Sequence, residues 1–245
     1  MEEDISMQTI IKKAVLMNLP PPPFCGTQMD ISIEMPGGEF GICRLVPDSG
    51  QTGDIDWGDG CIEHMAKTGG CVHRYLSSGD YTVSISDHFT AIGFSSRTAS
   101  DFKNVYAPKI RSVFSNAAHL VKLEQGAFSN AVNLASVDIA DIACTEIPVQ
   151  CFRDCKSLLS LDGLPLRATS IAMRSFDSCI MLKGDVNLPG IENIIGTSGN
   201  NPPFLGCNSI TIHFAAANEL KIRQSPVFEN APTLGAKDAA VVFDL

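Results

Sequence analysis

The chain has 245 residues, of which 44% are hydrophobic and 18% charged, a composition typical of a globular protein rather than a disordered one. Its formal net charge of −9 at pH 7 argues against binding to nucleic acid or to an anionic membrane surface, because both need a basic patch. No apolar run approaches the ~20 residues of a membrane-spanning helix, so we expect no transmembrane segment.

The first 23 residues are predicted to be an N-terminal arm that ends in a proline linker. Lys12 and Lys13 precede a short apolar segment, residues 14–19. This segment is shorter than the usual ~7–15 residue core of a signal peptide and follows acidic residues, so we expect no classical signal peptide. Residues 20–23 are four consecutive prolines, which form an extended and semi-rigid spacer.

Residues 24–94 are predicted to be all-β. Apolar and polar residues alternate over residues 31–35 and again over residues 81–85, as in strands with one buried face. Residues 40–46 form a further candidate strand. Several short strands, separated by turn signals about every ten residues, predict a small β-sandwich.

Three elements within this region occur in a recognisable order. They are the turn Trp57-Gly58-Asp59-Gly60, the pair His73-x-Tyr75, and the strand Gly79-x-Tyr81-x-Val83. Together they resemble the polycystic-kidney-disease (PKD) type of immunoglobulin-like domain. The resemblance implies a β-sandwich that acts as a non-catalytic spacer or binding module in a surface protein.

Three aspartates, Asp54, Asp56 and Asp59, lie within six residues of each other. Calcium takes several carboxylate and carbonyl oxygens, so this cluster is a candidate Ca²⁺ site, and we expect no other cofactor. The spacing does not fit an EF-hand loop, since position twelve is Met65 instead of glutamate. The alternative, which we favour, is a tight turn in which Asp and Gly are preferred for backbone reasons.

Four residues of zinc-ligand type follow this turn: Cys61, His64, Cys71 and His73. Their spacings of six residues and one residue match the usual zinc spacings poorly. We therefore interpret them as ordinary strand residues.

The second half of the chain repeats one pattern: Phe, two residues, Ala or Cys, two residues, and an aliphatic residue. The repeated phenylalanines are Phe114, Phe128, Phe152, Phe176, Phe204 and Phe228. Their separations of 14, 24, 24, 28 and 24 residues are in the range of solenoid repeats. One repeat cannot bury its apolar face alone, so we expect these rings to stack in a shared core.

Other positions of the repeat are equally regular. The second residue after each Phe is always small or polar, and the third, where the coils pack closely, is filled by Cys155, Cys179 and Cys207 in later repeats. This predicts buried free thiols rather than disulfides. The aliphatic residue nine positions after Phe, which predicts a strand, is replaced later by Asp185 and His213, so we expect irregular final coils.

The repeats resemble the BspA type of bacterial-surface leucine-rich repeat, best over residues 145–152 and 169–176. The resemblance implies a right-handed solenoid of about five to six coils over residues 95–245, mainly β with short helices. Residues 95–105 are predicted to join the two domains, and residues 196–203 to form an inserted loop. Residues 239–243 would be a closing strand in the cap that the last coil of a solenoid needs.

No catalytic motif is visible. The sequence contains no Gly-x-Ser-x-Gly, no His-Glu-x-x-His and no phosphate-binding or dinucleotide-binding glycine loop. Cys151 and Cys155 are separated by three residues instead of the two of a redox motif, so we interpret both as structural. We expect the protein not to be an enzyme.

The function predicted from these patterns is non-catalytic binding or adhesion, with one solenoid face presented to a protein or polysaccharide partner. Spacing alone selects Lys156, Arg174, Lys183 and Glu192 for that face. The family resemblance implies a cell-surface or secreted protein, whereas the missing signal peptide leaves a cytoplasmic or virion-associated location open. The alternatives are a structural component of a phage or other assembly and, third, a hydrolase accessory module.

Overall fold

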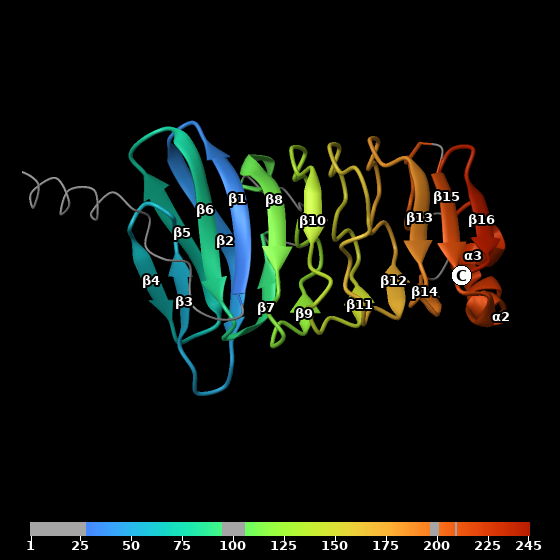
Figure 1. Cartoon of the computed structure of the whole chain (residues 1–245), viewed down its shortest axis with the longest axis horizontal. Coiled ribbons are helices and arrows are strands. Elements are labelled where there is room, and N and C mark those ends of the chain that lie inside the picture. Colours follow the sequence, from blue (N-terminus) through green and yellow to red (C-terminus); the bar gives the residue numbers. More distant parts are fainter. Residues whose placement is uncertain (1–27, 95–105, 197–200, 209) are drawn as a thin grey trace, which may run out of the picture.

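A computed structural model describes residues 28–94, 106–196, 201–208 and 210–245. The chain forms one elongated body in which strands are stacked along the long axis. Strands β1–β6 lie near one end and β16 lies at the other (Figure 1). The predicted N-terminal arm, the joining segment 95–105 and residues 197–200 of the predicted inserted loop lie outside the described residues.

Strands dominate the described residues, and the helices are short. The strands are β1 (Gln28–Met35), β2 (Gly38–Pro47), β3 (Gly53–Asp56), β4 (Ile62–Met65), β5 (Gly69–Tyr75), β6 (Gly79–Ser86), β7 (Phe89–Gly93), β8 (Ile110–Ser115), β9 (Lys122–Leu123), β10 (Ser136–Asp138), β11 (Glu146–Ile147), β12 (Ser170–Ala172), β13 (Gly184–Leu188), β14 (Asn193–Ile195), β15 (Ile210–Phe214) and β16 (Ala240–Phe243). The helices are η1 (Ala107–Lys109), η2 (Ala216–Asn218), α2 (Glu219–Arg223) and α3 (Pro226–Asn230).

The N-terminal strands form two sheets, with the orders β10-β8-β1-β6-β3-β4 and β5-β2-β7-β9. The strands predicted at residues 31–35, 40–46 and 81–85 are confirmed as parts of β1, β2 and β6. Their inward residues, among them Ile31 and Phe40, are fully buried in one hydrophobic core. The PKD-like, immunoglobulin-like sandwich remains a prediction for this region.

Both sheets continue past the predicted domain boundary at residue 94. β8 pairs antiparallel with β1, β10 pairs parallel with β8, and β9 pairs parallel with β7. The ring of Phe94 lies 5.4 Å from that of Phe128, measured between centroids. The hydrophobic core therefore runs through the boundary without a break.

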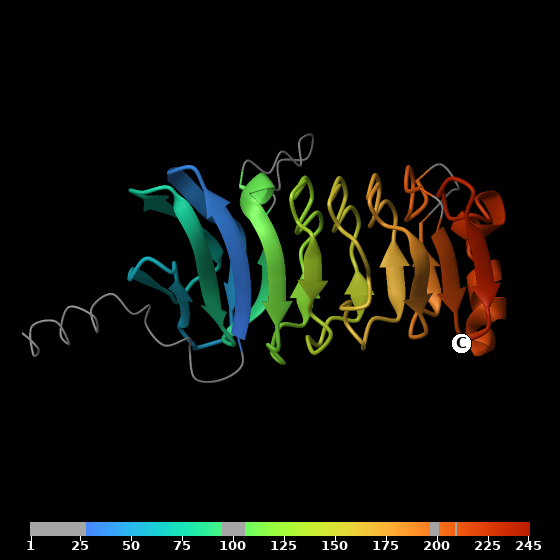
Figure 2. The ribbon, with the colours of Figure 1, turned by 45° about the horizontal axis from the view of Figure 1, so that its top comes forward.

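From β8 onward the chain forms a β-solenoid of about five turns over residues 112–243, which confirms the predicted solenoid, while its right-handed sense stays a prediction (Figure 2). Equivalent isoleucines are in register from coil to coil, with Ile147 of β11 beside Ile171 of β12, which lies beside Ile194 of β14. This repetition buries in every coil the apolar face that one coil alone would leave exposed.

The predicted column of phenylalanines is confirmed for four of its six members. The rings of Phe128, Phe152, Phe176 and Phe204 are nearly parallel, with centroids 5.1–5.5 Å apart. Phe94 occupies the first position of the column.

The prediction was wrong for the other two phenylalanines, Phe114 and Phe228. Phe114 is 45% exposed, because it lies on an outward-facing position of β8, next to the inward Val113. Phe228 lies on the short helix α3 and packs edge-on against Phe243 instead of joining the column.

Backbone geometry explains the small or polar residue two positions after Phe. Asn130, Asp154, Ser178 and Gly206 all have φ between 59° and 74°, the left-handed region. Glycine adopts this conformation without steric cost, and Asn and Asp tolerate it better than most residues. This turn lets each coil reverse and lets backbone groups of neighbouring coils pair, as in the 2.7 Å hydrogen bond from the amide of Phe152 to the carbonyl of Ser175.

The last coils are more regular than predicted. β13, β15 and β16 form a parallel sheet in which Val186, Ile212 and Val241 are in register. The apolar position has shifted by one residue, so Asp185 and His213 lie on the outer side of intact strands. The predicted closing strand at residues 239–243 is confirmed as β16.

Candidate functional site

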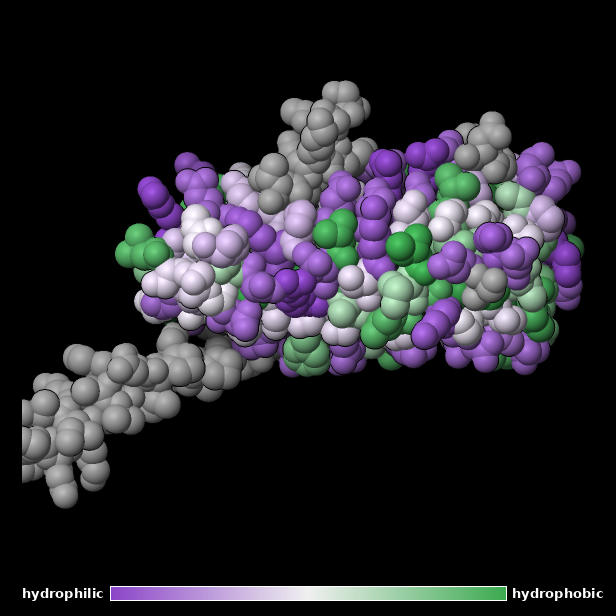
Figure 3. Space-filling view, turned by 90° about the horizontal axis from the view of Figure 1, so that it is seen from above, coloured by the Kyte–Doolittle hydropathy of each residue, from purple (hydrophilic) through white to green (hydrophobic). Residues whose placement is uncertain are grey.

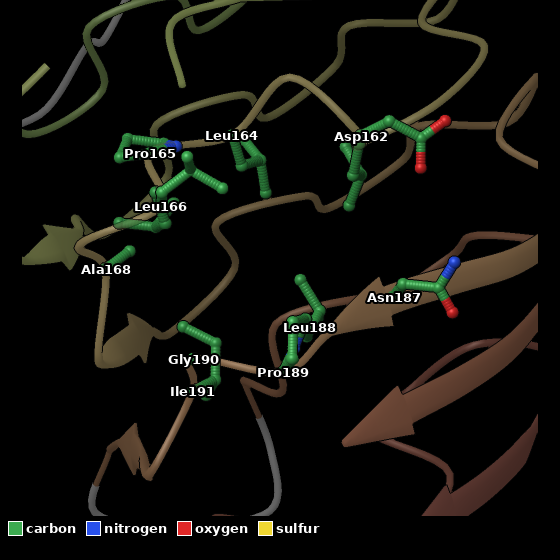
Figure 4. A pocket seen from close by; sticks show the side chains of 12 residues that line it. Asp162, Leu164, Pro165, Leu166, Ala168, Asn187, Leu188, Pro189, Gly190 and Ile191 are labelled. Atoms are coloured by element: carbon green, nitrogen blue, oxygen red, sulfur yellow. The ribbon is translucent and has the colours of Figure 1, made fainter. Parts of the chain in front are cut away.

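One concavity among the described residues is a groove between two consecutive coils, with a volume of about 210 Å³ (Figure 4). One wall comes from residues 161–168 and the other from the end of β13 and the loop after it. The lining residues are Ile147, Leu161, Asp162, Leu164, Pro165, Leu166, Ala168, Asn187, Leu188, Pro189, Gly190 and Ile191.

The groove lies where the sheet on this side of the solenoid is interrupted. β10 ends the six-stranded sheet, and β13 begins the next one. The intervening coil contributes only an isolated bridge between Gly163 and Asp138 of β10. β13 is therefore an edge strand in the middle of the solenoid.

The groove has an apolar floor and one charged end. Ile147 and Leu161 are buried beneath it, whereas Leu166 at its rim is 74% exposed. Asp162 and Asn187 lie together at one end, away from Leu166 and Ile191 (Figure 4). Among the described residues, the carboxylate of Asp162 forms no ion pair.

The four residues predicted from spacing are not joined by any ion pair or hydrogen bond among the described residues. Arg174 lies 3.8 Å from the carboxylate of Asp177, beside the phenylalanine column. Glu192 forms an ion pair of 2.7 Å with Lys221 of α2. Lys156 and Lys183 are exposed, and the single binding face built from these four residues stays a prediction.

Arg174 also lines a second concavity of about 290 Å³, together with Val149, Gln150, Met173 and Asn201. Nε of Arg174 and Oε1 of Gln150 are buried and have no hydrogen-bond partner among the described residues. Gln150 and Arg174 are equivalent residues of successive coils, and both have left-handed φ values of 57° and 55°.

The three aspartates of the predicted calcium site have separate partners. Asp54 contacts Nδ1 of His64 at 2.6 Å, and Asp56 accepts a 2.8 Å hydrogen bond from the amide of Gly58. Asp59 accepts a 3.1 Å hydrogen bond from the amide of Cys61. The last two contacts are those of a tight turn, and the calcium site stays a prediction.

The same turn brings Asp59 and Cys61 next to His73, although His73 lies on β5. Nε2 of His73 lies 2.7 Å from Oδ2 of Asp59, and its ring stacks on Trp57 with a centroid distance of 5.1 Å. One potential ligand atom from each of Asp59, Cys61 and His73 lies within 4.8 Å of the other two, so this group has the donor atoms to hold a metal ion such as zinc.

In the sequence, Cys61 and His73 stood out only as residues of zinc-ligand type at a poor zinc spacing, and Asp59 was not recognised as their neighbour. Of the other two residues considered for zinc, His64 pairs with Asp54, and Cys71 is buried. The pairing of β2 with β5 places His73 opposite Phe40, and only this tertiary arrangement carries it to the turn.

Electrostatics within this group oppose ionisation of the thiol. Burial acts to raise the pKa of Asp59, but hydrogen bonds from His73 and the Cys61 amide outweigh it and lower the pKa. The Asp59 carboxylate in turn raises the pKa of Cys61 above its ordinary value. A negative charge already present beside the sulfur disfavours a second one.

No helix among the described residues has the length and apolar character needed to cross a membrane. Comparison with curated proteins and with solved structures yields no match.

The profile of the BspA type leucine-rich repeat region matches residues 81–211, more than half of the chain, as six copies. The match begins at β6 and includes Phe94, in agreement with the place of that ring at the head of the column. Such repeats suggest a role in protein interaction or binding, and this solenoid fold is typical of non-catalytic binding modules. The chain thus belongs to the BspA-type leucine-rich repeat family.

Proposed function

We propose that the protein is a non-catalytic binding module whose solenoid recognises a protein partner. The observation that carries the proposal is a solenoid with exposed aliphatic side chains on successive coils: Leu159, Leu166, Ile180 and Met181 are 43–74% exposed. Seen from above, hydrophobic spots lie among hydrophilic residues over the solenoid (Figure 3). Mixed surfaces of this kind are usual in protein–protein interfaces.

A protein partner is favoured over a polysaccharide by the kind of side chain exposed. Among the described residues of the solenoid, Phe114 is the one large aromatic residue with a highly exposed side chain, and the other exposed apolar residues are aliphatic. Stacking on a row of aromatic rings is the common way to hold a sugar chain, and the solenoid offers no such row in its described part.

A position at the bacterial cell surface, with a role in adhesion, is the second part of the proposal. It is supported by the family resemblance alone. Protease treatment of intact cells that express the native protein tests this part: surface exposure predicts digestion, whereas protection until the cells are lysed would contradict it.

The binding role is tested by presenting the intact chain to arrays of proteins and of polysaccharides. We expect saturable binding to protein ligands and none to polysaccharides. A response restricted to polysaccharides, or no response on either array, would overturn the proposal.

A further inference from the structure

We propose that the groove between residues 161–168 and 187–191 binds an extended peptide segment, which adds as a strand to the free edge of β13. The segment would place an apolar side chain in the groove and a lysine or arginine beside Asp162. This inference rests on the proposed binding function and identifies its site and its ligand class.

The backbone of β13 supplies the first argument. β13 pairs with β15 in a continuous register from Gly184 to Leu188. On its other side, no backbone hydrogen bond joins it to residues 160–168 in the described part of the chain. A strand edge of this kind presents unpaired N–H and C=O groups, and the addition of a peptide strand is a recurrent way of satisfying them.

The coil on the far side of the groove pairs toward β10 and not toward β13. The carbonyl oxygen of Gly163 accepts a 2.7 Å hydrogen bond from the amide of Ile139. A side chain at position 163 would clash with the carbonyl of Val137, so glycine is needed for this close approach. The coil is thus drawn toward β10 and away from β13.

The shape and lining of the groove supply the second argument. The cavity of about 210 Å³ is lined mainly by leucine, isoleucine and proline. An apolar cavity of ~150 Å³ accommodates benzene, so this one has room for a branched aliphatic or aromatic side chain. Alternate residues of an added strand point to opposite faces, so every second residue of the peptide should be apolar.

Charge supplies the third argument. Asp162 lies at one end of the groove beside Asn187 and is not paired with a cation among the described residues (Figure 4). The chain as a whole carries a net charge of −9. Arg167 and Lys183, which are close in sequence to the lining residues, carry positive charges. We therefore expect the groove to prefer a cationic residue of the peptide only at the end where Asp162 lies.

The experiment is a selection from a random octapeptide library displayed on phage, with the intact chain as bait. Binders retained by the Leu166→Glu variant are removed by counter-selection. Leu166 is 74% exposed, so this substitution should leave the fold intact. We expect enriched peptides with alternating apolar residues and a Lys or Arg near one end.

Synthetic copies of the enriched peptides are then measured by fluorescence anisotropy. We expect the affinity to fall at least tenfold with Leu166→Glu and to be unchanged with Leu76→Glu, a matched control on the distant β5–β6 turn, where Leu76 is 93% exposed. Asp162→Lys should favour peptides whose cation is replaced by Glu. Methylation of the alternate amides that face β13 should abolish binding, whereas methylation of the other alternate set should leave binding intact, since only every second N–H of an added strand points to β13.

Three results would overturn the inference: no enrichment, equal binding to the Leu166→Glu variant, or binding that survives methylation of each of the two alternate sets of amides, tested separately. A dimer of the free chain that Leu166→Glu dissociates would show instead that a second copy occupies the groove. If protein ligands on the array bind the Leu166→Glu variant as well as they bind wild type, the groove is not the binding site. The proposed function would still stand. An empty array would refute the proposed function itself.

Discussion

The thiol of Cys179 donates a hydrogen bond to the backbone carbonyl of Phe152 in the preceding coil, with a sulfur–oxygen distance of 3.2 Å. The same contact joins Cys155 to Phe128 at 3.3 Å and Cys207 to Phe176 at 3.1 Å. Cysteine is small enough for this position, and its weak S–H donor reaches the carbonyl of the neighbouring turn. The cysteines therefore link coils by hydrogen bonds rather than by disulfides.

The phenylalanine column should carry much of the stability of the solenoid. Phe152 is fully buried between two rings, so we expect Phe152→Ala to lower the free energy of unfolding by about 3–5 kcal/mol, through lost burial and a new cavity. Phe114→Ala is the matched control and should cost much less, because Phe114 is 45% exposed. Urea unfolding measures both, and equal losses would contradict the column.

The left-handed turn after each Phe predicts an unusual effect of glycine. Ser178 has a φ of 63°, whereas the next coil has glycine at the equivalent position, Gly206. Ser178→Gly should be neutral or stabilising by up to about 1 kcal/mol, and Ser178→Val should destabilise by about 1–2 kcal/mol. Melting temperatures of the two variants test this, and the opposite order would show that backbone strain is not decisive here.

His213 should make stability depend on pH. Its hydrogen bond to Asp244, together with Asp185 at 3.5 Å, raises the pKa of His213 above its ordinary value. A histidine whose pKa is higher in the folded than in the unfolded protein stabilises the fold when it is protonated. This stabilisation is complete at a pH below the unfolded-state pKa of about 6.5, and it is lost as the pH rises through the folded-state pKa.

We therefore expect wild type to exceed His213→Gln in melting temperature by more at pH 5.5 than at pH 8.5. Asp244→Asn should reduce this pH-dependent difference, because it removes the main partner of the imidazolium. A difference independent of pH would mean that the ion pair contributes nothing.

Cys61 should become more reactive when Asp59 loses its charge. The Asp59 carboxylate raises the pKa of Cys61, so Asp59→Asn should shift the alkylation profile of Cys61 to lower pH while keeping an oxygen acceptor for the Cys61 amide. Iodoacetamide labelling with peptide mapping measures this profile. Cys71 is the internal control, since burial raises its pKa to about 12, and it should stay unlabelled in both proteins.

The continuity of the sheets predicts that residues 95–245 will not be stable alone. Their separation from the rest would expose one face of the Phe128 ring and the edge of β8, which pairs with β1 in the intact chain. We expect this fragment to aggregate or to lack cooperative unfolding, as followed by light scattering and circular dichroism. A monomeric fragment that melts cooperatively would support two independent domains.

Much of the solenoid could be predicted from sequence because its determinants are local. The period of the phenylalanines, the left-handed residue two positions later and the small residue after that all lie within one turn of chain. The first member of the column could not be found in this way. Phe94 lies outside the repeat spacing and directly follows β7 of the N-terminal sheets, so only the pairing of β7 with β9 brings it onto Phe128.

The sequence by itself determined that apolar coils must stack, since each repeat carries an apolar face that it cannot bury alone. The tertiary structure alone decided which edges stayed open and which distant side chains met. Gly163 pairs with β10 and leaves one edge of β13 open, and β5 carries His73 to the turn of Asp59. The physical reason is that backbone pairing between coils and strands depends on their register in space, which no local spacing of residues encodes.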